Sequence, residues 1–410
     1  MVAPMSLVSA QRSRAARLAV SVLFFANGAA SASILPRLPA IKDGLGLSNA
    51  ELGAAVAALP LGGLIAGGFA GLLIARFGSG RVAAVAGTLD VLALAALGLA
   101  PTWLALAGAY FVMGMFDATM DASMNTHGVG VERVYRRSIL QGFHGSWSFG
   151  CMVAGAVGAL AAWASVPVAV HLSVVAVALA VAVVASSRGL LPASISDVRD
   201  RPDDEAEVRI HPRNAPHLLA ILLPVALLGI LCVVVQTAAS TWSALFGTDV
   251  LGLSAGLAAV GYVLYAAAMT VSRMVNDRWV DGLGPTRFVR IGAVISLLAM
   301  LAVIASAPLH APLLAFAGFA GIGVGTSPMF PVMVATAGSR PGIPSGYGVA
   351  LTSWMVRVGL IAAPALIGAA ADALGLATAL WIPAVVAVAI FVLAPVMTGH
   401  GAVAARRTVA

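Results

Sequence analysis

The chain has 410 residues, of which 60% are hydrophobic and only 10% are charged. Soluble globular domains carry far more charge, so this composition excludes an ordinary soluble protein and indicates membrane-spanning segments. The formal net charge is +7, but the arginines cluster at the ends of apolar segments. That distribution follows the positive-inside pattern and argues against nucleic acid as a partner.

Hydropathy and charged breaks predict an all-α membrane protein with twelve spans. The expected spans are 16–40, 50–76, 81–100, 102–128, 138–164, 166–187, 217–245, 253–280, 286–306, 310–336, 343–371 and 375–398. The basic N-terminus is followed by no small-residue cleavage site, so we interpret the first span as a membrane helix rather than a removed signal peptide.

Charge asymmetry predicts the topology. The turns expected outside the cytoplasm hold only Arg37 and Lys42 as basic residues, whereas arginines fill the opposite turns. Both termini are therefore expected in the cytoplasm, as an even number of spans also requires. The expected organisation is a six-helix bundle over 1–188, a cytoplasmic linker over 189–216, a second bundle over 217–400 and a tail over 401–410.

Two carboxylates and an amide recur every four residues within the fourth expected span: Asp117, Asp121 and Asn125. This spacing places them on one face of a helix. Acids inside a membrane usually mark an ion or substrate pathway, and a low dielectric favours their neutral form. Asp121 is the first candidate for a proton-carrying group and Asp117 the second. The alternative is that both are structural hydrogen-bonding groups. Asp90, on the third span, stands alone and is interpreted as structural.

Short matches at a nearly constant offset indicate that the second half repeats the first. Asn27–Ser31 matches Gln236–Ser240, Phe77-Gly78 with Arg81 matches Leu283-Gly284 with Arg287, and Ser146-Trp147 matches Ser353-Trp354. A parallel repeat of this kind predicts a pseudo-two-fold axis and a site near the midplane between the halves.

Two six-helix halves joined by a long cytoplasmic loop resemble the major facilitator superfamily. The stretch from Gly71 to Arg81 is similar to that superfamily's G-x-x-x-D-R-x-G-x-R loop, although Ala75 stands where an acid is usual. The resemblance implies a cytoplasmic gate in each half. Its expected residues are Gly71, Arg76, Gly78 and Arg81 in the first half and Asp277, Arg278, Asp281 and Arg287 in the second.

The first half also resembles the fucose-permease-like branch and its poorly characterised bacterial inner-membrane members. The matching pieces include Phe24–Gly28, Leu35–Ile41 and Phe143–Gly150. In sugar:proton symporters of that branch, an acid on the fourth helix takes part in proton coupling. The resemblance assigns this role to Asp121, and His144 stands where an amide is expected. His144 is therefore a third proton-coupling candidate, with a helix cap or an interhelical hydrogen bond as the alternative.

The remaining polar and aromatic residues on cavity-lining helices are candidate substrate contacts. They are Asn27, Asn125, Trp147, Gln236, Trp242, Trp354 and Arg357. Interhelical hydrogen bonding or packing is the alternative for the amides and for Trp147. Arg357 needs a carboxylate partner such as Asp117 or Asp121, an anionic substrate, or a path for its side chain to the interface.

The sequence contains no ATP-binding loop, no metal-ligand cluster and no nucleophile elbow, so neither a cofactor nor an enzyme activity is expected. We expect a monomeric inner-membrane carrier that moves a small polar organic solute, for example a sugar-like compound, by proton symport and alternating access. A proton-coupled drug or metabolite exporter is the alternative, favoured by Met113, Met115, Met120 and Met124 near the acids. A membrane enzyme or a sensor fits less well, because neither a catalytic set nor an output domain is present.

Overall fold

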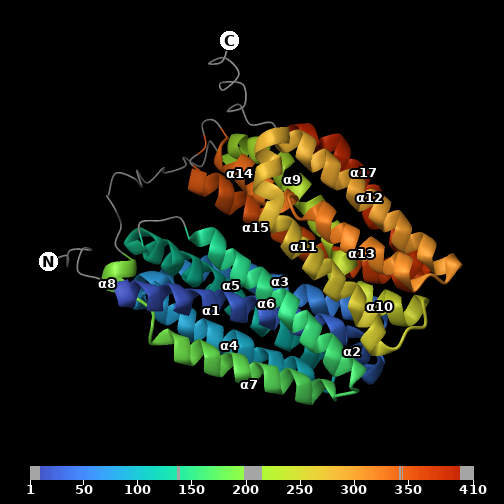
Figure 1. The fold of residues 1–410 in the computed structure, drawn as a ribbon, viewed down its shortest axis with the longest axis horizontal. Coiled ribbons are helices and arrows are strands. Elements are labelled where there is room, and N and C mark those ends of the chain that lie inside the picture. The colour runs from blue at the N-terminus through green and yellow to red at the C-terminus, as the bar shows by residue number, and fades with distance from the viewer. Residues whose placement is uncertain (1–9, 136–138, 198–214, 341–342, 344, 398–410) are drawn as a thin grey trace, which may run out of the picture. The chain divides into compact units, whose positions relative to one another are not determined.

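The computed structural model describes residues 10–135, 139–197, 215–340, 343 and 345–397, and these are almost entirely helical (Figure 1). Within helices, the side chains of 215–217, 219, 276–281, 345–347 and 349–350 are not described. No β-strand occurs in the described ranges, and twelve helical segments there are long and apolar enough to cross a membrane. The expected all-α fold with twelve spans is confirmed. The expected linker falls largely, and the expected tail entirely, outside the described residues.

The chain divides into two compact units. Unit 1 comprises Met1–Arg201 with Ser254–Ala259, and unit 2 comprises Pro202–Leu253 with Val260–Ala410. The helices of unit 1 are α1 (Ala10–Ser33), η2 (Leu35–Arg37), α2 (Leu38–Leu45), α3 (Asn49–Phe77), α4 (Ser79–Leu99), α5 (Trp103–Tyr135), α6 (Leu140–Trp163), α7 (Val168–Ser187) and α8 (Ala193–Ser196).

The helices of unit 2 begin with α9 (Ala215–Ser240), α10 (Ser243–Leu245), a π-helical turn η4 (Phe246–Val250), α11 (Ala255–Leu283), whose first residues belong to unit 1, and α12 (Pro285–Leu309). They continue with α13 (Pro312–Thr326), α14 (Met329–Gly338), α15 (Ser345–Leu374), α16 (Leu376–Ala379), α17 (Trp381–Leu393) and η5 (Ala394–Met397). The tenth span is broken between α13 and α14, where Pro328 cannot donate a helical hydrogen bond.

The two units repeat the same helix pairs. α1 packs against α6 as α9 packs against α15, α4 against α5 as α12 against α13, and α4 against α7 as α12 against α17. This order agrees with the internal repeat that the sequence predicts.

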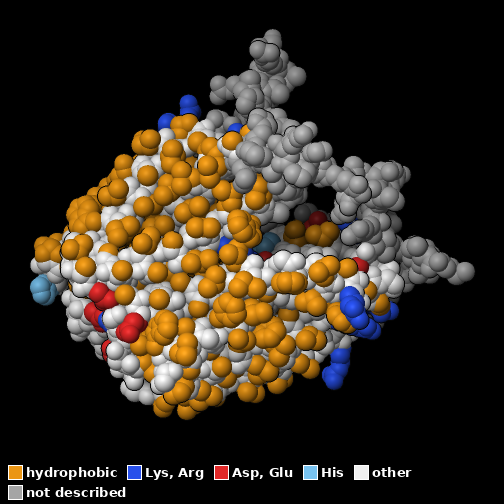
Figure 2. Space-filling model, turned by 180° about the vertical axis from the view of Figure 1, so that it is seen from behind, with side chains coloured by type: hydrophobic (Ala, Val, Ile, Leu, Met, Phe, Trp, Pro, Cys, Tyr) orange, Lys and Arg blue, Asp and Glu red, His pale blue; other side chains and the backbone are white. Residues whose placement is uncertain are grey.

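The helices expose much apolar surface, as a bilayer requires. Figure 2 shows hydrophobic side chains covering most of the face in view. Large apolar residues such as Leu72, Val174 and Leu313 are 69%, 62% and 81% exposed. Since water penalises such a surface, it indicates contact with lipid.

Candidate functional site

The site in unit 1 begins where α1 crosses α6. A Cβ on Gly28 would overlap the backbone carbonyl of Trp147, and a Cβ on Gly150 would overlap that of Phe25. Glycine at both positions lets the two backbones approach closely. The neighbour of Gly28 is Asn27, and its side chain therefore comes within reach of α6. The indole Nε1 of Trp147 donates a hydrogen bond to Asn27 Oδ1 at 2.9 Å.

This hydrogen bond sets the orientation of the Asn27 amide. An indole N–H can only donate, so the amide oxygen faces Trp147 and the amide nitrogen faces the other way. Asn27 Nδ2 donates to Asp117 Oδ1 on α5 at 2.8 Å and also approaches the sulfur of Met120 at 3.7 Å. Asn27 is only 3% exposed, so three helices are joined through one buried amide.

Asp90 on α4 belongs to the same group and is not isolated, contrary to the sequence interpretation. It is fully buried, interacts electrostatically with Asp117 and lies beside the Asn27 side chain. Neither of its carboxylate oxygens makes a hydrogen bond of regular geometry within the described residues. Packing of α4 against α5 and α1 brings it there. We call Asn27, Asp90, Asp117 and Trp147 the Asn27 cluster.

Asp121 and Asn125 lie further along α5 and interact with each other. Asn125 Nδ2 donates to the Asp121 backbone carbonyl at 2.8 Å and to Asp121 Oδ1 at 3.0 Å. Asp121 is exposed, whereas Asp117 is half-buried. The two acids share a helix face, as the spacing predicts, but only Asp117 is hydrogen-bonded to Asn27.

His144 lies on α6, one turn before Trp147. It is exposed, and its ring stands edge-on against Phe24 of α1, with 5.1 Å between ring centroids. His144 therefore flanks the α1–α6 crossing without belonging to the Asn27 cluster.

The substrate candidates of unit 2 lie on α9 and α15 and in the turn after α9. Among the described residues, Gln236 Nε2 reaches only the sulfur of Cys232, at 3.7 Å within the same helix. Trp242 is fully buried, and its indole nitrogen has no partner among the described residues. Trp354 is 52% exposed and Arg357 is half-buried. The expected pairing of Arg357 with an acid of unit 1 stays a prediction.

The expected gate residues differ in their surroundings. Arg76, Arg81 and Arg287 are exposed, and a Cβ on Gly71 would meet no atom within 4 Å. Gly71 therefore makes no close helix contact. Gly78 does make a close contact, because a Cβ there would lie 2.8 Å from Ala193 Cβ on α8, and its φ is +86°. The side chains of Asp277, Arg278 and Asp281 lie outside the described residues.

The contact of α8 with Gly78 belongs to a hydrogen-bonded group that the sequence analysis missed. Asp197 Oδ2 accepts from the backbone N–H of Ser79 at 2.8 Å, at the N-terminus of α4, and Ser79 Oγ donates to Asp197 Oδ1. The buried His127 accepts from the Leu191 N–H through Nε2 at 3.2 Å, so its ring proton sits on Nδ1, 2.9 Å from Ser79 Oγ. We call these residues the α8 contact.

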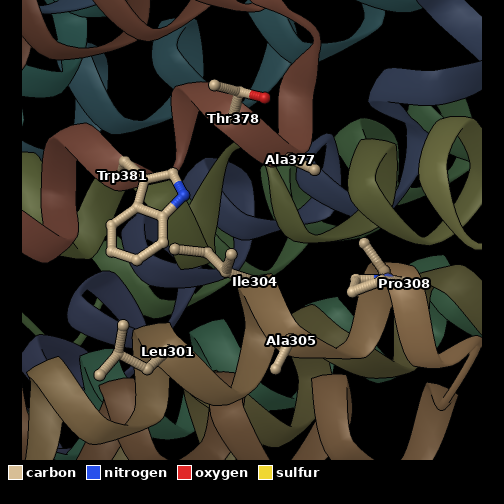
Figure 3. A pocket seen from close by; sticks show the side chains of 8 residues that line it. Leu301, Ile304, Ala305, Pro308, Ala377, Thr378 and Trp381 are labelled. Atoms are coloured by element: carbon tan, nitrogen blue, oxygen red, sulfur yellow. The ribbon is translucent and has the colours of Figure 1, made fainter.

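A pocket of about 440 Å³ lies in unit 2 between α12 and the α16–α17 turn (Figure 3). Its lining is apolar apart from Thr378 and the Trp381 indole, and no candidate residue lines it. Within the described part of the chain, no group of three or more His, Cys, Asp or Glu side chains is placed to hold a metal ion.

The fold and sequence match known transporters. The family model of the Major Facilitator Superfamily matches residues 20–356. An uncharacterised transporter of this type from Yersinia pestis is 30% identical over 86% of this chain and 88% of its own length. A nucleoside transporter structure matches with a TM-score of 0.76 and 12% identity, covering 93% of this chain and 99% of its own. A D-xylose–proton symporter matches with a TM-score of 0.74 and 16% identity over 94% and 97%.

At these identities the structural matches show the fold alone, whereas the family model matches the sequence over residues 20–356. Members of this family carry small molecules across membranes and are not enzymes. The twelve apolar spans fit a multi-pass protein of the bacterial inner membrane. The chain belongs to the major facilitator superfamily and is a membrane transporter.

Proposed function

We propose that this transporter couples proton movement to the symport of a small polar organic solute, and that the Asn27 cluster is its proton site. The observation that carries the proposal is the Asn27 amide, which holds Asp117 at 2.8 Å beside the fully buried Asp90. Two neighbouring carboxylates in a low-dielectric interior cannot both ionise cheaply, so one proton shared by the pair relieves the repulsion.

The contacts favour Asp117 over Asp121 as the exchanging acid. Asp117 is half-buried and joined to α1, so a change in its charge is felt by a second helix and, through Asn27, by Trp147 on a third. Asp121 is exposed and paired within its own helix. We propose Asp121, Asn125 and His144 as groups that line the proton or solute path beside the cluster.

The exposure of Trp147 favours a polar, ring-shaped solute. It is half-exposed while its N–H is committed to Asn27, so the indole face remains for stacking on a sugar or a base. Two of the similar solved structures are a nucleoside transporter and a D-xylose–proton symporter. Gln236, Trp242, Trp354 and Arg357 are proposed to contribute contacts from unit 2.

The export alternative depends on a methionine-lined cavity. Met113, Met120 and Met124 are at most 1% exposed, so they pack in the interior of unit 1 and only Met115 is half-exposed. This burial favours symport of a polar solute over export of an apolar drug.

The cytoplasmic gate is proposed to include the α8 contact. Ala75 stands where the loop motif has an acid, and Asp197 supplies an acid to the N-terminus of α4, four residues further along. With both termini and the linker in the cytoplasm, this contact would hold the start of the linker against unit 1. We expect a monomer that functions without nucleic acid.

The proposal is tested in proteoliposomes that contain a pH-sensitive dye. Sugars, nucleosides, sugar acids and cationic drugs are added outside, with empty liposomes and an uncoupler as controls. Symport predicts acidification of the lumen by one solute class. A proton crossing about 100 mV supplies about 2.3 kcal/mol, enough for more than tenfold accumulation of a neutral solute. Alkalinisation of the lumen by cationic drugs would instead identify an exporting antiporter.

A further inference from the structure

Unit 1 buries a second group of nitrogen-bearing side chains away from the Asn27 cluster, where η2 meets the start of α7. Arg37 is 4% exposed and His171 is 5% exposed. Arg37 Nη2 donates to the backbone carbonyl of Val166 at 2.5 Å, two residues before α7 begins. His171 lies in the first turn of α7 and interacts electrostatically with Arg37.

Most of the polar atoms of these two side chains have no partner. Arg37 Nε and Nη1 and both ring nitrogens of His171 are buried and make no hydrogen bond within the described residues. No carboxylate in the described part of the chain pairs with Arg37, although a guanidinium is always charged. A buried cation without a counter-charge is strongly disfavoured, above all in a membrane protein. The missing component is therefore negative.

The start of α7 offers further donors to the same place. Pro167 precedes the helix, and no side chain among the described residues caps its first turn. The first peptide N–H groups of a helix lack intrahelical acceptors and form the positive end of the helix dipole. Guanidinium N–H groups, an imidazole N–H and a helix N-terminus together form a typical anion site.

We propose that Arg37, His171 and the N-terminus of α7 bind a small monovalent inorganic anion, with chloride as the representative ion. Both side chains are almost fully buried, which favours a small ion over an organic group, and one permanent positive charge matches one negative charge. The ion holds the η2 turn of the first span against α7. This proposal does not depend on which solute the transporter carries.

The test uses the full-length wild-type protein in detergent. Thermal unfolding is followed with a thiol-reactive dye, which reports exposure of Cys151 and the buried Cys232. Sodium gluconate is replaced stepwise by sodium chloride at constant ionic strength and neutral pH. A bound anion stabilises the folded state by mass action, so Tm is expected to rise by a few degrees and to saturate. A Tm that does not change with chloride would overturn the proposal, because water would then satisfy these nitrogens.

Variants locate the ion. Arg37→Gln is expected to abolish the chloride-dependent rise, and bromide is expected to give an anomalous X-ray signal beside His171 in wild-type crystals. Arg340→Gln is the matched control, because Arg340 Nη2 likewise donates to a backbone carbonyl, that of Val396, at 2.5 Å in unit 2. It should retain the full rise. If Arg37→Gln does not fold, His171→Leu makes the same comparison. A full rise in either unit 1 variant would place the ion elsewhere and contradict the assignment.

Discussion

α1 and α9 occupy corresponding places in the two units, each packed against the fifth long helix of its half. In unit 1 the Trp147–Asn27 hydrogen bond joins α6 to α1, and Asn27 also donates a hydrogen bond to Asp117 on α5. In unit 2 the matching Gln236 reaches only Cys232 on its own helix, and the matching Trp354 is 52% exposed. The backbone arrangement is repeated, but the part of unit 2 that the structure describes has no equivalent chain of hydrogen bonds.

The fourth spans of the two units differ in the same way, because only the one in unit 1 carries acids. α5 carries Asp117 against α4, which carries the buried Asp90. The corresponding α13 has no charged residue, and its Gly318, Gly323 and Gly325 lie so close to neighbouring backbone that a Cβ would overlap it. Helix packing is thus preserved in both units, while within the described residues the buried acids lie in unit 1.

The largest effect is expected from Asn27→Leu, compared with Gln236→Leu in unit 2. Asn27→Leu removes the hydrogen bonds that Asn27 makes with Trp147 and Asp117, so it should lower the free energy of unfolding by about 2–4 kcal/mol and abolish transport. Gln236→Leu removes only a weak contact to sulfur and should cost about 0.5 kcal/mol or less. Thermal unfolding and solute uptake measure both variants. Equal losses would remove the distinction between the two units.

Trp147→Phe isolates one hydrogen bond of the Asn27 cluster. It keeps the aromatic ring but removes the indole N–H, and should cost about 1–2 kcal/mol. The control is Trp354→Phe, which is expected to change stability by about 0.5 kcal/mol or less because the indole is exposed. The measurement is the shift in Tm. A larger shift for Trp354→Phe would show that unit 2 has its own unrecognised network.

Asp197→Ala extends the comparison to the turns that precede α4 and α12. Asp197 accepts a hydrogen bond at the N-terminus of α4, whereas α12 has no such side-chain cap within the described residues. Loss of the cap should cost about 0.5–2 kcal/mol and free α8, so protease should cut faster after Asp197. Asp249→Ala, an exposed acid in unit 2, serves as the control. Unchanged proteolysis would mean that the α8 contact does not hold the linker.

The smallest expected difference is between Gly78→Ala and Gly284→Ala. Both glycines have positive φ, +86° and +76°, so alanine should cost about 1 kcal/mol at either position. Only at Gly78 would the new methyl group also press on Ala193. Gly78→Ala should therefore be the less stable variant by several tenths of a kcal/mol. Equal Tm values would show that α8 yields without cost.

Much of the architecture follows from the sequence, since the twelve apolar spans and the repeat depend on hydropathy and short matches alone. The shared face of Asp117 and Asp121 follows from their spacing. Spacing within one helix does not show which neighbouring helix a side chain faces. The sequence therefore could not predict the hydrogen bond between Asn27 and Asp117, or the pairing of Asp121 with Asn125 within α5.

The neighbours of Asp90 and the contacts of His127 were not predicted, for a related reason. Asp90 lies between Leu89 and Val91 in an apolar span, and helix packing brings it beside Asp117. The available signal was physical: an acid in the middle of an apolar span needs a partner on another helix. His127 contacts Ser79 and Leu191, and the polar composition of the expected linker concealed that its first residues fold back onto unit 1.

The central claim is that the proton is carried at Asp117 in the Asn27 cluster. Its most direct test measures solute-driven pH change in proteoliposomes for the wild type, Asp117→Asn and Asp121→Asn, two acids one turn apart on α5. Asp117→Asn should abolish the pH change while solute counterflow continues, and Asp121→Asn should retain it. Wild-type coupling in Asp117→Asn, with loss in Asp121→Asn, would contradict the account and move the proton site away from the Asn27 cluster.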